Sequence, residues 1–319
     1  MSPFTARRRE SVAALGERQL IARIRRWLGD VTPAAPFGIG DDCAVIPPTR
    51  HHQLVTTDPV IHGRHFDDAL PARAVGAKLL KRNLSDIAAM GGRPIAAVVS
   101  LALAPETSTV WLRGFYLGLA ATARKFRVKV VGGDVTQAPR GFFGAFLTLH
   151  GESTCSRVVT RTGARPGDRI LVTGRLGGSL QGHHFRFIPR LAEGAWLAAR
   201  AEVVAMMDVS DGIANDLDSL TTGGLAAALD EAAIPVSPAA RQMARRSGCT
   251  PLAHALGDGE DYELLVVIRA RADLARLQQA WRRRFPRLPL SFIGAFVPRD
   301  RLPAKTVNLA ACRGYEHLR

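Results

Sequence analysis

The sequence predicts a mixed protein of the α+β or α/β class with two domains. Its 319 residues are too many for one ordinary core and too few for three. Strand-like and helix-like stretches alternate along the first half, as in a mixed domain with a sizeable core. A polar stretch at 153–168, with glycines and arginines, breaks this pattern before the alternation resumes. We therefore expect a domain boundary near residue 153.

The first half contains most of the clear elements. Residues 1–15 are basic, and we expect them to be disordered. Apolar residues then recur at helical spacing and predict a short helix at 16–28. The N-terminal domain, 16–153, continues with predicted strands at 53–57, 95–103, 128–131 and 142–150 and predicted helices at 72–90 and 107–126.

The second half, 154–319, is predicted to be a C-terminal α/β domain. A Pro-Gly-Asp turn at 166–168 comes directly before an apolar strand at 169–173. The other elements predicted here are helices near 190–205, 212–222 and 271–283 and strands at 262–268 and 288–293.

Composition favours a globular protein of the cytoplasm. Apolar residues make up 47% and charged residues 22%, and no apolar run approaches the roughly 20 residues that span a bilayer. The stretch after the N-terminal arginines is too short and mixed for a secretion signal. The four cysteines, which we expect to be free thiols in a reducing compartment, are Cys43, Cys155, Cys249 and Cys312.

The net charge of +15 raises nucleic acid as a partner. Only five of the 43 basic residues are lysines, so an arginine bias pervades the chain and does not form one dense block. The sequence also lacks the interleaved aromatic and basic residues of single-strand binders. We therefore expect neither nucleic acid nor a membrane as partner, although a positive field can attract anionic nucleotides.

Acidic residues recur in short motifs that carry glycines or hydroxyls. Carboxylates beside hydroxyls are the hard oxygen ligands that Mg²⁺ uses when substrate phosphates complete its shell, and glycines let the backbone approach a ligand. Each motif alone is more typical of an ordinary turn than of a metal site. The five motifs, which we expect to form turns or ligand-facing loops, are Gly38–Asp42, Thr56–Asp58, Asn83–Asp86, Gly132–Asp134 and Asp208–Gly212.

Asp86 is the strongest single candidate among these carboxylates. It lies with Asn83 and Ser85 on a largely apolar predicted helix, where an uncompensated carboxylate is costly unless it binds something. Asp134 follows an apolar strand and two glycines, a common place for a loop that faces a ligand. Together the motifs predict several Mg²⁺ ions that hold a polyphosphate.

No P-loop and no protein-kinase signature occurs, so phosphoryl transfer would need another architecture. The ordered motifs resemble the thiamine-monophosphate kinase family, within the superfamily of aminoimidazole ribonucleotide synthetase, and the resemblance runs from about residue 16 to 315. The motifs that carry it are GIGDDCAV at 38–45, TTD at 56–58, NLSDIAAMGGRP at 83–94, GGD at 132–134, TRTGARPGD at 160–168, DVSDG at 208–212 and GEDYELL at 259–265.

The resemblance implies roles for particular residues, and it implies no covalent nucleophile. The implied Mg²⁺ ligands are Asp42, Thr56, Thr57, Asp58, Asp86, Asp134, Asp208 and Asp211. The implied ATP contacts are Gly133, Asp134, Arg161 and Ser210. The implied contacts with the second substrate are His65, Glu260 and Tyr315.

The resemblance further implies an ATP-dependent, Mg²⁺-dependent kinase that converts thiamine monophosphate to thiamine diphosphate by direct in-line transfer. It implies the two-domain aminoimidazole ribonucleotide synthetase-like fold, in which the N-terminal domain binds ATP and Mg²⁺ and forms a homodimer. A requirement for K⁺ stays open. Two alternatives also stay open: an ATP-dependent synthetase of the same superfamily, against which the GEDYELL motif argues, and a non-catalytic nucleotide-binding paralogue.

Two places depart from the family pattern. Residues 180–188 form a compressed stretch with histidines and phenylalanines, and a shortened entrance there could alter the choice of substrate. Lys81 and Arg82 stand where the family tends to have small apolar residues. We expect neither departure to touch the metal ligands.

Overall fold

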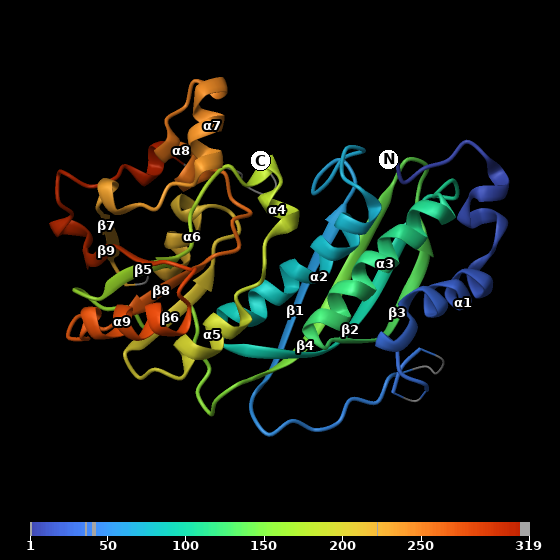
Figure 1. The fold of residues 1–319 in the computed structure, drawn as a ribbon, viewed down its shortest axis with the longest axis horizontal. Helices are drawn as coiled ribbons and strands as arrows, with labels where there is room; N and C mark the ends of the chain where they lie inside the picture. The colour runs from blue at the N-terminus through green and yellow to red at the C-terminus, as the bar shows by residue number, and fades with distance from the viewer. Residues whose placement is uncertain (1, 36, 40–42, 222, 313–319) are drawn as a thin grey trace. The chain divides into compact units, whose positions relative to one another are not determined.

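The computed structural model describes residues 2–35, 37–39, 43–221 and 223–312. The chain forms two compact units, each with its own sheet (Figure 1). Unit 1 comprises residues 1–87 and 92–153, and unit 2 comprises 88–91 and 154–319. No helix of the described part is both long enough and apolar enough to cross a bilayer.

Unit 1 contains a four-stranded sheet in the order β1-β4-β2-β3. Neighbouring strands are antiparallel except β2 and β3, which are parallel. The helices lie along the sheet (Figure 1), and α2 and α3 approach each other closely at glycines, because a Cβ on Gly76 would meet the carbonyl of Phe115. The elements are α1 (Glu17–Leu28), β1 (Gln53–Ile61), α2 (Ala72–Ala89), β2 (Gly92–Leu103), α3 (Thr109–Phe126), β3 (Lys129–Gln137) and β4 (Phe143–Ser153).

The two faces of this sheet differ in burial. Val99 and Leu147 pair with each other in the ladder, and both are buried. Val60, two residues along β1 from Asp58, is also buried. These three residues mark the covered face of the sheet. The next row lies on the opposite face, where Ser100 is exposed and Phe146 is 39% exposed. Side chains alternate between the faces along each strand, so the ladder register assigns every motif residue in these strands to one face or the other.

Unit 2 contains a five-stranded antiparallel sheet in the order β6-β8-β5-β9-β7. Two separate apolar clusters include alternate residues of the central strand β8, one with Leu265 and Val267 and the other with Leu264 and Val266. The sheet is therefore buried on both faces. The elements are β5 (Arg169–Thr173), α4 (His183–Arg186), α5 (Leu191–Ala198), β6 (Val203–Asp208), α6 (Ile213–Leu220), β7 (Leu225–Leu229), α7 (Pro238–Ser247), α8 (Pro251–Gly257), β8 (Leu264–Ile268), α9 (Leu274–Arg284) and β9 (Leu290–Pro298).

The structure corrects several expectations. The predicted helix at 190–205 ends at Ala198, and its last residues begin strand β6, because a short apolar run suits a buried strand as well as a helix. Strand β7 and helices α7 and α8 were not predicted. The motifs Thr56–Asp58 and Gly132–Asp134 were expected in turns or loops, but they lie inside strands β1 and β3.

The N-terminal segment also differs from the expected disorder. Its described residues form two short 3₁₀ turns, Arg8–Glu10 and Val12–Ala14. The backbone of Val12 donates to the carbonyl of Thr107 at 2.9 Å, and the Val12 side chain is buried. These main-chain bonds hold the segment against unit 1, while the three arginines at 7–9 stay exposed.

Candidate functional site

Two predicted site residues of unit 2, Ser210 and Glu260, meet through a main-chain hydrogen bond. The amide of Glu260 donates to the carbonyl of Ser210 at 2.7 Å, and the amide of Tyr262 donates to that of Val209 at 2.8 Å. Gly259 has φ +70°, and a Cβ there would come within 2.7 Å of the Ser210 carbonyl, so only glycine allows this approach. The structure thus places the Ser210–Asp211 turn directly beside Glu260.

A carboxylate that the sequence did not single out fixes this turn. Oδ2 of Asp216, in the first turn of α6, accepts from the amides of Ser210 at 3.0 Å and Asp211 at 3.2 Å. Burial, with the nearby charges of Asp208 and Asp211, raises the pKa of Asp216 to about 8. The crowding of carboxylates opposes ionisation, and a bound cation would relieve it.

Arg161 reaches the same side of unit 2 through its neighbours. The carbonyl of Thr160 accepts from the amide of Met206 at 3.0 Å, two residues before Asp208 on strand β6. The Arg161 side chain is exposed. A guanidinium in this position can bind a phosphate group.

A buried polar network lies beneath the Glu260 turn. Glu263, which is 2% exposed, pairs with Arg190 and accepts from the hydroxyl of Thr173 at 2.6 Å. Oδ1 of the buried Asp261 accepts from the amide of Gly177 at 2.8 Å. Burial, opposed by that bond, raises the pKa of Asp261 well above its usual range. The acidic residues after Glu260 are therefore structural, although the sequence allowed a solvated acidic turn.

In unit 1, strand β1 and helix α2 bring three predicted residues together. The hydroxyl of Thr56 donates to Oδ2 of Asp86 at 2.5 Å. Asp58 lies two residues along, on the same face of β1, and its Oδ1 is 3.3 Å from Nη2 of Arg82. We expected Arg82 not to touch a metal ligand, and the structure corrects this because Arg82 pairs with Asp58. Asp86 and Asp58 are both half-buried.

Asp134 does not join this group within unit 1. Its ladder row runs through Ser100 and Phe146 on the open face, while Asp58 belongs to the adjacent row on the covered face. The strands β1 and β3 form opposite edges of the sheet, three strand spacings or about 14 Å apart. A Cβ on Gly133 would come within 2.0 Å of the Val99 carbonyl, so this glycine is needed for packing.

Thr57 also points away from Asp58. It is exposed on the open face, where its hydroxyl accepts from Thr148 at 3.3 Å. Only its backbone carbonyl remains on the strand beside the other motif residues. That Thr57 supplies a hydroxyl or carbonyl oxygen to Mg²⁺ stays a prediction, and its hydroxyl lies on the opposite face of the sheet from Asp58.

His65 lies in a fixed turn after β1. Its Nδ1 accepts from the amide of Ile61 at 3.1 Å, and its carbonyl accepts from the fully buried ammonium of Lys78 at 2.8 Å. The ring is therefore oriented by its own turn, with Nε2 as the donor of the neutral form. Two other predicted residues, Asp42 and Tyr315, lie outside the described residues.

The described carboxylates suit Mg²⁺ that is shared with phosphate. No three His, Cys, Asp or Glu side chains within the described ranges are grouped to hold a metal by themselves. Mg²⁺ commonly takes one or two carboxylates and completes its octahedron with water and substrate phosphates. Asp208 with Asp211, and Asp86 with the Thr56 hydroxyl, fit that chemistry because their donors are hard oxygens.

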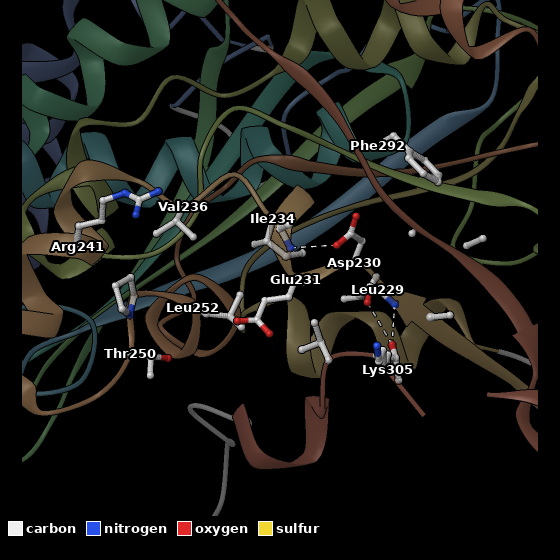
Figure 2. A pocket seen from close by; sticks show the side chains of 17 residues that line it. Leu229, Asp230, Glu231, Ile234, Val236, Arg241, Thr250, Leu252, Phe292 and Lys305 are labelled. Atoms are coloured by element: carbon white, nitrogen blue, oxygen red, sulfur yellow. Dashed lines mark hydrogen bonds between the residues drawn. The ribbon is translucent and has the colours of Figure 1, made fainter. Parts of the chain in front are cut away.

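A separate hollow of about 1120 Å³ lies at the β7 edge of unit 2. In Figure 2, the carboxylates of Asp230 and Glu231 are seen between Arg241 on the left and Lys305 on the right. Charges of both signs line it, so no single ligand charge is favoured. None of the predicted site residues that the structure describes contributes to its wall.

Sequence reasoning missed the residues that support the site. Asp216 could have been noticed as a carboxylate in the first turn of a helix directly after the DVSDG motif. Tyr262 and His184 contact Glu260, the first through a hydroxyl 3.2 Å from Oε1 and the second through Nδ1 at 3.5 Å from Oε2. The contact with His184 joins segments about 75 residues apart, so no local sequence pattern indicates it. Tyr262 is only two residues from Glu260, but their contact depends on the turn conformation, which the sequence pattern does not show.

Comparison with known proteins shows which family the chain resembles. Residues 40–151 match the family model described as AIR synthase related protein, N-terminal domain. The chain is 40% identical to the thiamine-monophosphate kinase of Rhodopirellula baltica over 248 aligned residues. The alignment covers 74% of this chain and 77% of that protein.

Two solved structures extend the likeness to the fold. Thiamine-monophosphate kinase from Stenotrophomonas maltophilia matches with a TM-score of 0.72 at 32% identity, over 87% of this chain and 93% of that chain. AaThiL complexed with AMPPCP and TMP matches with a TM-score of 0.67 at 29% identity, over 92% of this chain and 93% of that chain. These likenesses confirm the predicted fold class.

Proposed function

The chain belongs to the thiamine-monophosphate kinase family, and on that premise we propose that it transfers the γ-phosphoryl group of ATP to thiamine monophosphate. The product of this transfer is thiamine diphosphate. The observation that carries the proposal is the hydrogen-bonded junction of the Ser210–Asp211 turn with Glu260. This junction places a proposed nucleotide contact, a proposed metal ligand and a proposed acceptor contact on touching segments.

The chemistry requires little from the protein beyond positioning and charge. The acceptor phosphate is already ionised at neutral pH, so it can attack the γ-phosphorus without a general base. Mg²⁺ bound at the carboxylates would neutralise the phosphate charge as the bond between the γ-phosphorus and the leaving ADP breaks. Asp216 holds the Ser210–Asp211 turn, and Thr56 orients Asp86 by its hydrogen bond. Arg161 supports the nucleotide phosphates.

We assign recognition of the acceptor to Glu260, His65 and Tyr315. The thiazolium ring of thiamine is cationic, and the Glu260 carboxylate, which is 23% exposed at the side chain, can complement that charge. His65 offers an oriented ring donor. Tyr315, from the family motif, is proposed to stack on a ring of the substrate.

We further propose that the protein binds several Mg²⁺ ions, lies in the cytoplasm and forms a homodimer. Whether turnover also requires K⁺ is a question for the same assay. The open face of the unit 1 sheet supports the dimer, because it carries Val55, 68% exposed, and Phe146, 39% exposed. A second copy of the chain is the proposed occupant of this face. Asp134 lies on the same face, so it would be close to the partner subunit.

The direct test measures ADP release from purified protein with ATP and Mg²⁺, with and without thiamine monophosphate. The proposal expects ADP only when thiamine monophosphate and Mg²⁺ are both present, with thiamine diphosphate as the second product. ADP release that does not depend on thiamine monophosphate would favour a synthetase of the same superfamily or another acceptor. ATP binding without turnover would favour the non-catalytic paralogue.

A further inference from the structure

The compressed segment 180–188 packs directly on the Glu260 turn in unit 2. Nε2 of His183 lies 3.0 Å from the carbonyl of Asp261, to which it can donate. The ring of Phe187 stacks on Tyr262 with 4.0 Å between centroids and 18° between planes. His184 faces the Glu260 carboxylate. We call His183, His184 and Phe187 the α4 clamp.

The turn that the clamp holds is strained. Glu260 has φ +53° and Tyr262 has φ +52°, although neither is glycine. Non-glycine residues in this left-handed region are strained and persist only when the surroundings fix them. The clamp supplies such fixation, because Phe187 and Tyr262 are only 2% and 3% exposed.

The clamp also orients the charged group itself. Oε1 of Glu260 accepts from the hydroxyl of Tyr262 at 3.2 Å, and Oε2 faces Nδ1 of His184 at 3.5 Å. One carboxylate oxygen therefore accepts a hydrogen bond and the other lies beside the imidazole of His184, which limits the rotation of the side chain. The His184 side chain is only 14% exposed, so its contact with Glu260 is largely shielded from water.

From these contacts we propose that the α4 clamp is a positioning element for acceptor recognition, and that His184 and Phe187 set the affinity for the cationic ring of the acceptor. The inference rests on the proposed function, because it takes Glu260 as the contact for that ring. It adds that Glu260 is pre-oriented by residues of the compressed segment. The segment is therefore part of the acceptor site and tunes its specificity, while nucleotide binding does not depend on it.

The test compares the KM for thiamine monophosphate with the KM for ATP in clamp variants. His184→Ala removes the imidazole beside Glu260, and we expect the KM for thiamine monophosphate to rise about tenfold, as for loss of a polar contact with a charged group. His184→Asn places an amide nitrogen near the former Nδ1 and should restore most of the affinity. The kcat and the KM for ATP should stay within about twofold, because the clamp touches no proposed nucleotide contact.

Phe187→Leu supplies a second, independent variant. It keeps an apolar side chain under Tyr262 but removes the ring stacking, so the KM for thiamine monophosphate should rise while thermal unfolding changes little. Matched controls are His51→Ala, an exposed histidine of unit 1, and Phe285→Leu, an aromatic that packs on Trp281 in unit 2. Neither control should change either KM.

Calorimetric titration with thiamine monophosphate, in the presence of Mg²⁺ and AMPPCP, measures binding without turnover. Weaker binding in His184→Ala and Glu260→Gln, with the controls unchanged, supports the inference even if the wild-type protein shows no turnover, an outcome that would sink the proposed function alone. Unchanged binding in His184→Ala, or an equal rise in both KM values, overturns the inference. If Glu260→Gln leaves binding unchanged, its premise is wrong.

Discussion

The acidic motifs of the two units are organised in different ways. In unit 2, a main-chain hydrogen bond joins the Ser210–Asp211 turn to Glu260. The carboxylate of Asp216 fixes the same turn by accepting from the amide of Ser210. In unit 1, Asp58 and Asp86 lie on the covered side of the sheet, whereas Asp134 lies on the open face at the far edge. Unit 2 thus holds a self-contained group, and the unit 1 carboxylates are divided between two surfaces.

The difference teaches that one motif type can serve two structural purposes. The unit 2 motifs end strand β6 and precede strand β8, and the pairing of these two neighbouring strands brings the motifs together. The unit 1 motifs lie within strands, so the ladder register keeps them apart.

The largest effect should come from removing a charge in unit 1. Asp86→Asn keeps an acceptor for the Thr56 hydroxyl but loses the negative charge that would bind a cation. We expect turnover to fall about 1000-fold, or about 4 kcal/mol of transition-state stabilisation. Steady-state ADP release measures this fall, with Asp300→Asn, an exposed carboxylate, as the control. Retention of more than a tenth of the activity would contradict the role of Asp86.

In unit 2, the supporting carboxylate Asp216 should matter through its two amide bonds. Asp216→Ala removes both, and we expect the apparent Mg²⁺ affinity to fall about 10- to 100-fold, as for other residues that orient metal ligands. Asp216→Asn can still accept from both amides and should lose much less. The Mg²⁺ dependence of turnover gives the affinities. An equal loss in both variants would show that charge, and not hydrogen bonding, is what Asp216 contributes.

The two adjacent threonines of β1 should respond differently because they face opposite sides of the sheet. Thr56→Val removes the donor to Asp86, a bond to a charged group that contributes about 1.5–3 kcal/mol, so turnover should fall about tenfold or more. Thr57→Val leaves the backbone carbonyl in place and should change turnover by less than about threefold. Equal losses would mean that the face assignment of this strand is wrong.

The smallest effect concerns stability and its pH dependence in unit 1. Burial, and then the charge of Lys125, lowers the pKa of Lys81 to about 8. The unfolded chain therefore binds more protons than the folded protein between pH 8 and the ordinary value of 10.5, so the free energy of unfolding rises with pH across this window. Because Lys81 is only partly buried, we expect a rise of about 1 kcal/mol.

Lys81→Met keeps a side chain of similar length without the charge. The variant should be more stable than the wild type at pH 7, and its free energy of unfolding should lack the rise between pH 8 and 10. Urea denaturation at the two pH values measures the difference, and Lys129→Met, at an exposed lysine, is the control. If the free energy of unfolding of Lys81→Met rises with pH as much as that of the wild type, the pH dependence belongs to other groups.

The sequence predicted long or continuously apolar elements and missed several shorter ones. Helix α2 and strand β5 were predicted within a residue of their observed ends. Strand β7, Leu225–Leu229, consists of leucine and alanine, which have no strand signature, so it was missed. The Thr56–Asp58 and Gly132–Asp134 motifs resemble turns in composition, but tertiary pairing holds both in strands.

The candidate site was predictable only as far as its motifs. Nothing in the sequence indicates which side of the sheet Thr57 faces, or that Arg82 pairs with Asp58, because these depend on how the strand packs. The contacts of the α4 clamp with Glu260 likewise join distant segments. Local patterns identify such groups, and the fold alone decides which of them meet.

The most direct test of the central claim follows the stereochemistry of transfer to thiamine monophosphate. ATP made chiral at the γ-phosphorus with oxygen isotopes is turned over, and the configuration of the terminal phosphate in thiamine diphosphate is determined. Direct in-line transfer, with no nucleophile on the protein, predicts inversion. Retention would require a covalent phosphoryl intermediate on the chain, and it would contradict the account, as would a complete lack of thiamine diphosphate.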